Sequence, residues 1–238
     1  ALGSSIKKYY RSFVDGAKTS GDILRSFIES RGIPVTGGVK VINNAKKSTL
    51  LYQHESKPLK EIIRSLNLYS NNYLADVLIN NIGAFKKNIL NYKNHSKPES
   101  TYDLGVQSLH DFLVNKVGTN KNGFNLISGS GLSSKNRISA RSVAGVLNLM
   151  YERPQYFPEF LYSLPVSGHE GTLKTRFKDP ATVLLKGALR AKTGRLTDPV
   201  SVASLAGFYF HKHYGWISFV VIQNGDHGKP QPLVEDLQ

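Results

Sequence analysis

The sequence predicts an α+β fold in which a C-terminal antiparallel sheet packs against the helices that precede it. Apolar residues recur at helical spacing through most of the chain up to Tyr151. From Leu189 onward, in contrast, the segments are rich in β-branched and aromatic residues and are separated by turn signals. A length of 238 residues, of which 40% are apolar and 20% charged, is sufficient to bury a core.

The N-terminal part of the chain predicts helices followed by strands. Apolar residues at helical spacing indicate two helices within residues 5–30, and we expect the second to end at Gly32. Residues 33–42 combine β-branched side chains with turn glycines, and residues 48–52 follow after a polar loop. These two segments predict a pair of strands.

The middle of the chain predicts consecutive helices. Residues 56–69 fit one helix, with Pro58 near its start. A second helix follows at once, because the polar residues 70–72 can cap it, and we expect it to end at Gly83. The lysine- and asparagine-rich residues 86–100 are expected to form a loop.

Beyond that loop, two more helices precede the strands of the expected sheet. We expect helices around residues 106–113 and 139–151, with a turn-rich loop at residues 128–133 between them. The last two of the expected strands are joined by a turn at residues 211–215. Four strands are expected, at residues 183–186, 189–193, 200–210 and 216–223.

The net charge is strongly positive. With 31 basic and 17 acidic residues, the formal charge of +14 would steer the protein toward anionic surfaces. The basic residues are dispersed, so the pattern favours a solvated basic surface over a nucleic-acid interface. A nucleic-acid-binding protein stays an alternative that depends on charge alone and would require strongly salt-dependent DNA binding.

Several classes of site and segment have little support. The chain has no cysteine, which excludes disulfides and thiol catalysis. His211 and His213 could share a metal, but without an evident third ligand an exposed turn is favoured. No apolar run approaches the roughly 20 residues of a membrane span, and residues 1–4 lack signal-peptide features. We therefore expect a soluble chain, either mature or truncated.

Two short motifs carry the candidate chemistry. Ser70 and Asn72 lie where one predicted helix meets the next, so a hydroxyl and an amide can face a cleft, although such a pair alone is typical of a helix cap. Lys192, Thr193 and Gly194 lie in a predicted strand. An ammonium beside a hydroxyl can hold a carboxylate, and glycine allows another backbone to approach, although the tripeptide alone is typical of a solvent-facing lysine beside a bulge.

Together these motifs resemble the second and third motifs of penicillin-binding proteins and serine β-lactamases. From about residue 23 to residue 223, the chain is similar to the D-Ala-D-Ala carboxypeptidase/endopeptidase family of low-molecular-mass penicillin-binding proteins. Asn71 departs from that family, which often has aspartate there. The similar segments, in order, are Gly129–Ser133, Leu164–Pro165 with Gly168, Gly171–Leu173 with Arg176, Ala191–Gly194 and Leu205–Phe208.

The resemblance implies a fold, a function and a location. The fold would be that of β-lactamases and transpeptidases, with residues 1–238 forming a single penicillin-binding domain that is incomplete at its N-terminus. The activity would be that of a bacterial serine peptidase of the periplasm or cell envelope, a D-Ala-D-Ala carboxypeptidase, an endopeptidase or both. Its partners would be peptidoglycan peptides, with β-lactams as inhibitors and without nucleic acid, and it would need no metal or organic cofactor.

The resemblance also implies roles for particular residues. An upstream serine would attack the D-Ala carbonyl to form an acyl-enzyme that water then hydrolyses. Ser70 would relay a proton to the leaving amine, and Asn72 would hydrogen-bond the substrate amide. Lys192 would bind the terminal carboxylate or raise the local potential, and the backbone N–H of Arg195 would complete the oxyanion hole. The expected substrate-binding residues are Thr193, Gly194 and Arg195.

The family's nucleophile motif, Ser-x-x-Lys, has no convincing copy. Ser4 with Lys7, and Ser5 with Lys8, match the spacing of one helical turn, but their basic surroundings indicate a wet helix and a chance match. We expect the nucleophile in a segment before Ala1, so that this chain alone forms no acyl-enzyme. The alternative is a non-catalytic domain of the same fold that binds wall peptide or anionic polymer.

Overall fold

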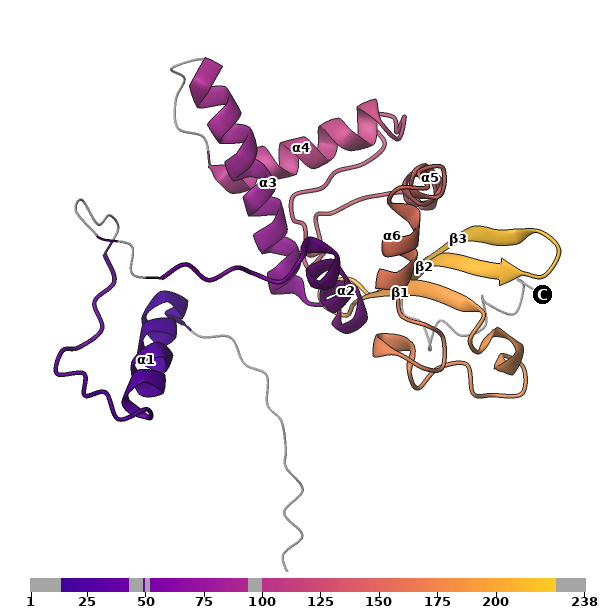
Figure 1. Cartoon of the computed structure of the whole chain (residues 1–238). Coiled ribbons are helices and arrows are strands. Elements are labelled where there is room, and N and C mark those ends of the chain that lie inside the picture. The colour runs from indigo at the N-terminus through magenta and orange to yellow at the C-terminus, as the bar shows by residue number, and fades with distance from the viewer. Residues whose placement is uncertain (1–13, 43–48, 50–51, 94–99, 226–238) are drawn as a thin grey trace, which may run out of the picture. The chain divides into compact units, whose positions relative to one another are not determined.

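The structure is a computed structural model that describes residues 14–42, 49, 52–93 and 100–225 (Figure 1). The chain divides into two compact units, Ala1–Glu55 and Ser56–Gln238. Within the described ranges the secondary structure comprises six α-helices and a three-stranded antiparallel sheet, which confirms the predicted α+β class. No helix in these ranges combines the length and apolar character needed to cross a membrane.

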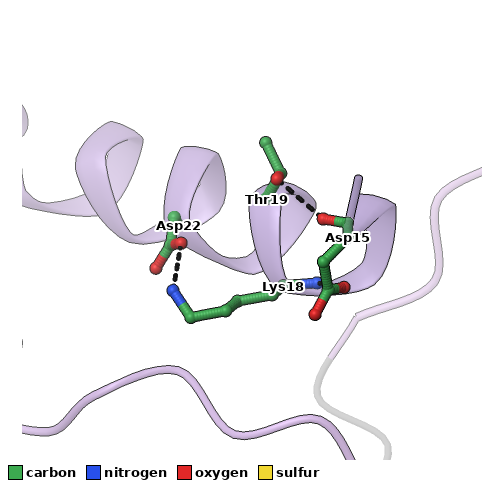
Figure 2. A network of polar contacts seen from close by, with 4 residues as sticks. All are labelled: Asp15, Lys18, Thr19 and Asp22. Atoms are coloured by element: carbon green, nitrogen blue, oxygen red, sulfur yellow. Dashed lines mark hydrogen bonds and ion pairs between the residues drawn. The ribbon is translucent and has the colours of Figure 1, made fainter. Parts of the chain in front are cut away.

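The first unit contains helix α1, Gly16–Glu29, whose start is fixed by local polar contacts (Figure 2). Asp15 caps the helix, because its side chain accepts a hydrogen bond of 2.9 Å from the amide of Lys18. The Lys18 ammonium in turn pairs with Asp22 one turn later, at 2.9 Å. The other helix expected near the N-terminus lies largely outside the described residues.

The strand pair predicted in this unit is wrong for its first member. Residues 33–42 are irregular, and no strand pairs with them in the part of the chain that the structure describes. A strand needs a partner to satisfy its backbone, and the adjacent Gly37 and Gly38 weaken strand formation further. Of the second expected strand, only Thr49 and Tyr52 are described.

The second unit begins with the helices that lead to the candidate site. Helix α2, Leu59–Tyr69, confirms the helix predicted over residues 56–69, except that it begins only after Pro58. Helices α4 and α5 agree with their predictions, and each is capped by the serine before it. The short helix α6 was not predicted. The bounds are α3, Asn72–Lys93, α4, Thr101–Asn115, α5, Ala140–Tyr151, and α6, Phe157–Ser163.

The prediction that the helix after Ser70 ends at Gly83 is wrong, because α3 continues to Lys93, and residues 86–93 of the loop expected at 86–100 are therefore helical. Gly83 lies where α3 crosses α4, and a Cβ atom added there would come within 1.6 Å of the carbonyl oxygen of Thr101. At the same crossing, a Cβ atom on Gly105 would come within 2.0 Å of the carbonyl oxygen of Ile79. Glycine therefore permits a close helix crossing here and does not end the helix.

The C-terminal sheet consists of β1, Leu189–Leu196, β2, Val202–His211, and β3, Gly215–Asn224, in that order. These three strands confirm the prediction. The fourth expected strand, residues 183–186, is wrong, because Val183–Leu185 forms the 3-10 turn η2. This turn places the buried Leu185 in the core under the sheet, whereas Val183 and Leu184 are exposed.

Different segments cover the two faces of the sheet. Leu189 and Ala191 of β1 pack with Leu173 and Phe177 on one face. Phe208 of β2 packs on the other face with a cluster from α5 and α6 that includes Leu147. Because side chains alternate along a strand, Lys192 points away from the core that holds Ala191.

We expect Gly83→Ala to destabilise the protein by about 2 kcal/mol or more, because the new methyl group overlaps the α4 backbone. Chemical denaturation of both proteins measures the difference. Gly16→Ala is the matched control, since nothing lies within 4 Å of the methyl group it adds. Equal stability of Gly83→Ala and the unmodified chain would show that the two helices are free to separate.

Candidate active site

Ser70 occupies an unusual backbone position at the end of α2. Its φ of 52° and ψ of 53° lie in the left-handed region, which costs a non-glycine residue on the order of 1 kcal/mol. The amides of Ser70 and Asn71 both donate to the carbonyl of Leu66, which closes the helix end. The chain thus turns sharply, and α3 begins at Asn72.

The capping interpretation of Ser70 does not hold for its hydroxyl. The side chain of Asn71 caps α3, because its Oδ1 atom accepts a hydrogen bond of 3.1 Å from the amide of Leu74. The hydroxyl of Ser70 instead accepts a hydrogen bond from Lys192. Ser70 is therefore free for a role other than completing the helix start.

Lys192 and Ser70 meet although 122 positions separate them in the sequence. The Nζ atom of Lys192 lies 2.7 Å from the Oγ atom of Ser70, and it also donates to the carbonyl of Thr193 at 2.6 Å. The two motifs singled out in the sequence are therefore in direct contact. A helix end and a strand together place an ammonium beside a hydroxyl.

Burial changes the protonation of Lys192. Removal from water lowers the pKa of this half-buried lysine from 10.5 to about 8, because the charged form loses hydration. Within the described ranges no carboxylate forms an ion pair with it to offset that loss. At neutral pH the ammonium therefore predominates, but a neutral amine is readily reached, which suits a group that takes part in proton transfer.

The other four predicted site residues lie close to Ser70 or Lys192 in the sequence, but their surroundings in the structure differ. The hydroxyl of Thr193 donates to that of Thr172 at 2.9 Å. A Cβ atom at Gly194 would come within 2.4 Å of Ser204 Oγ on β2, so glycine is required there by the neighbouring strand. Asn72, two residues after Ser70, is exposed, and so is Arg195.

Sequence reasoning did not single out the groups that surround the motifs. Thr172 is the middle residue of the 3-10 turn η1, Gly171–Leu173, and its contact with Thr193 could not be inferred from spacing. The only signal was that this segment is similar to the family. A groove of about 800 Å³ runs along α2 and is lined in part by Leu68 and Tyr162, but neither Ser70 nor Lys192 lines it.

Two other sets of candidate residues were the possible metal ligands His211 and His213 and the Ser-x-x-Lys matches near the N-terminus. His211 Nδ1 accepts hydrogen bonds from the amides of His213 and Tyr214, at 3.2 and 3.3 Å, which gives it a structural part in the hairpin turn. No group of three or more potential metal ligands occurs among the described residues. Ser4 and Ser5, the two Ser-x-x-Lys matches, lie outside the described residues.

Comparison with known proteins gives a consistent result. Residues 3–236 match the D-Ala-D-Ala carboxypeptidase 3 (S13) family. The chain is 29% identical over 231 residues to a D-alanyl-D-alanine carboxypeptidase of Actinomadura sp. strain R39, covering 94% of this chain and 39% of that protein. It is 27% identical over 206 residues to the D-alanyl-D-alanine carboxypeptidase DacB of Haemophilus influenzae, covering 87% of this chain and 40% of that protein.

A solved structure agrees with the sequence comparisons. Penicillin-binding protein 4 (DacB) from Haemophilus influenzae, in complex with a β-lactam, matches with a TM-score of 0.67 and 27% identity. The match covers 91% of this chain and 48% of that one. The chain thus spans less than half the length of these relatives.

We expect the stability contributed by position 192 to depend on pH in a defined direction. The folded-state pKa of Lys192 is lowered, so the folded state binds fewer protons than the unfolded state between about pH 8 and pH 10.5. Stability should therefore rise with pH through this window, and relative to Lys192→Met the unmodified protein should gain about 2 kcal/mol between pH 7 and pH 10.

Denaturation at the two pH values measures this gain. Lys121→Met, at an exposed position, is the matched control for the general effect of removing a lysine. The same difference between the unmodified protein and Lys192→Met at both pH values would contradict the lowered pKa.

Proposed function

The chain belongs to the S13 family of D-Ala-D-Ala carboxypeptidases, and we propose that it supplies the substrate-binding part of a serine peptidase that cleaves D-Ala-containing peptides of the bacterial cell wall. The observation that carries this proposal is the hydrogen bond of 2.7 Å between Lys192 and Ser70. It supports the proposal because both family motifs would have to contact one substrate. Their side chains also come from elements far apart in the sequence.

The proposed reaction is an acyl transfer to a serine. The hydroxyl oxygen of the nucleophilic serine bonds to the D-Ala carbonyl carbon, and the bond from that carbon to the leaving amine breaks. The serine's proton passes to its lysine base, and Ser70 Oγ gives a proton to the leaving nitrogen and regains one from that base. The Lys192 ammonium, by donating to Ser70 Oγ, stabilises negative charge on that oxygen during the transfer. Water then hydrolyses the ester.

Substrate binding is assigned to the strand β1. Thr193 would hold the terminal carboxylate with its hydroxyl, and the charge of Lys192 would raise the potential there. The backbone N–H of Arg195 would stabilise the developing oxyanion, and Asn72 would hydrogen-bond the substrate amide. Residues 165–167 pair with the start of the outer edge of β1, so an extended peptide would align along that edge after Ala191.

The nucleophile is the part of this proposal that these residues do not supply. We place it in a Ser-x-x-Lys motif outside the 238 residues, because the matched relatives are more than twice as long. With that part present, the protein would have the fold of β-lactamases and transpeptidases. It would act in the periplasm or cell envelope, with residues 1–238 belonging to one penicillin-binding domain.

A second candidate is a domain of the same fold that binds wall peptide or anionic polymer without catalysis. The formal charge of +14 favours this candidate, and so does the lack of a Ser-x-x-Lys motif in the sequence after residue 8. Labelling of the intact gene product with a fluorescent penicillin separates the two, because a binding domain forms no covalent ester.

In the complete enzyme, we expect Ser70→Ala to slow acylation by roughly 10²- to 10⁴-fold, the usual contribution of a proton relay. Stopped-flow measurement of β-lactam acylation tests this. Asn71→Ala is the matched control, since it removes the α3 cap, costs about 1 kcal/mol and leaves the relay hydroxyl in place. Unchanged acylation in a folded Ser70→Ala protein would exclude the relay role.

We further expect the isolated 238-residue chain to form no covalent adduct with a reporter β-lactam. A nucleophilic serine needs a lysine of lowered pKa in a dry pocket, and the basic, polar surroundings of Lys7 and Lys8 do not predict one. Mass spectrometry after incubation provides the measurement. An adduct on Ser4 or Ser5 would instead make this chain a complete compact enzyme.

A further inference from the structure

The 3-10 turn η1 connects the two halves of the candidate site. Gly171 has a φ of +49° and lies so close to α2 that an added Cβ atom would come within 2.3 Å of the carbonyl oxygen of Leu68. The next residue, Thr172, holds the hydroxyl of Thr193 at 2.9 Å. The turn therefore contacts the backbone two residues before Ser70 and also the side chain that follows Lys192.

Glu170, which immediately precedes this turn, is held by Arg64 of α2. The Arg64 Nη2 atom lies 3.0 Å from Glu170 Oε1, and the two side chains are only 20% and 34% exposed. Arg64 Nη1 donates to the carbonyl of Tyr162, and the guanidinium lies 3.9 Å from the centre of the Tyr162 ring. A guanidinium that is fixed on one side by α6 can hold a carboxylate on the other in a defined orientation.

The second oxygen of Glu170 makes this pair difficult to explain as a simple stabilising contact. Its Oε2 atom is buried and has no hydrogen-bond partner in the described part of the chain. A buried oxygen without a partner costs free energy, and a single partly exposed ion pair offsets little of that cost. What the pair does provide is a fixed distance between α2 and the start of η1.

We propose that Glu170 is a positioning residue of the active site. Held by Arg64, it keeps Gly171 against α2 and Thr172 against Thr193, so that Ser70 and Thr193 retain the spacing needed to engage one substrate. This inference rests on the proposed function of that site, but Glu170 acts through the turn and is not assigned any contact with substrate. A displacement of about 1 Å in such a site can lower a reaction rate roughly 100-fold.

The titration of Lys192 provides a test that needs no substrate. In the 238-residue chain labelled with ¹³C-lysine, NMR follows the side-chain signals with pH, and Lys192→Met identifies the signal of Lys192. In Glu170→Gln we expect its midpoint to rise by about half a unit or more, because a loosened turn lets water reach the ammonium. Removal of the negative charge alone would lower the midpoint, so the direction of the shift distinguishes geometry from charge.

Two further variants complete the experiment. Thr172→Val preserves the shape of the side chain but removes its bond to Thr193, and the same upward shift is expected. Asp111→Asn is the matched control, because it removes the 3.1 Å ion pair with Lys86 between α3 and α4 and should leave the midpoint unchanged. Among the described residues, Lys192 donates hydrogen bonds to Ser70 and to the carbonyl of Thr193, and neither residue is altered in these variants.

The outcomes separate this inference from the proposed function. An unchanged or lowered midpoint in folded Glu170→Gln would overturn the positioning role. If that variant does not fold, an unchanged midpoint in Thr172→Val would overturn it, because Glu170 is proposed to act through this turn. A raised midpoint in a protein whose complete form is never acylated would support the positioning role and contradict the peptidase. A raised midpoint together with slowed acylation of the complete enzyme would support both.

Discussion

The hydrogen bond from Lys192 to Ser70 depends on the positions of both α2 and β1 in the second unit. It requires α2 to end in a left-handed turn, and it requires β1 to present Lys192 on the face opposite its apolar core. The ammonium must also lie deep enough to lose hydration, and this is the physical origin of its lowered pKa. The surrounding helices and turns therefore hold a polar contact that neither element would form alone.

Much of the fold could be predicted because local signals agreed with the tertiary structure. The helices that begin after Pro58 and after Ser139 lie close to where the sequence predicted them, and β2 and β3 follow runs rich in β-branched and aromatic residues. The errors arise where tertiary contacts override local preference. Gly83 permits a close helix crossing, and residues 183–185 form a 3-10 turn that buries only Leu185 in the core.

In the candidate site, too, some features could be predicted from the sequence and others depend on tertiary contacts. Its two motifs could be chosen from residue type and family likeness, and their proximity follows from the proposed common substrate. The parts that connect them could not be predicted, because they depend on contacts across the fold: Asn67 donating to Ser163 at 2.8 Å, Arg64 pairing with Glu170, and Thr193 donating to Thr172. Ordinary polar residues at these positions carry no spacing signal in a single sequence.

The left-handed backbone at position 70 also bears on how this protein can change. Glycine is the residue that adopts φ 52° without strain, so a Ser70→Gly change would relieve the local backbone while removing the hydroxyl that Lys192 contacts. Selection for folding and selection for chemistry thus act in opposite directions at one codon. A homologue with glycine at this position would be recognisable from its sequence as one that has kept the scaffold and abandoned the reaction.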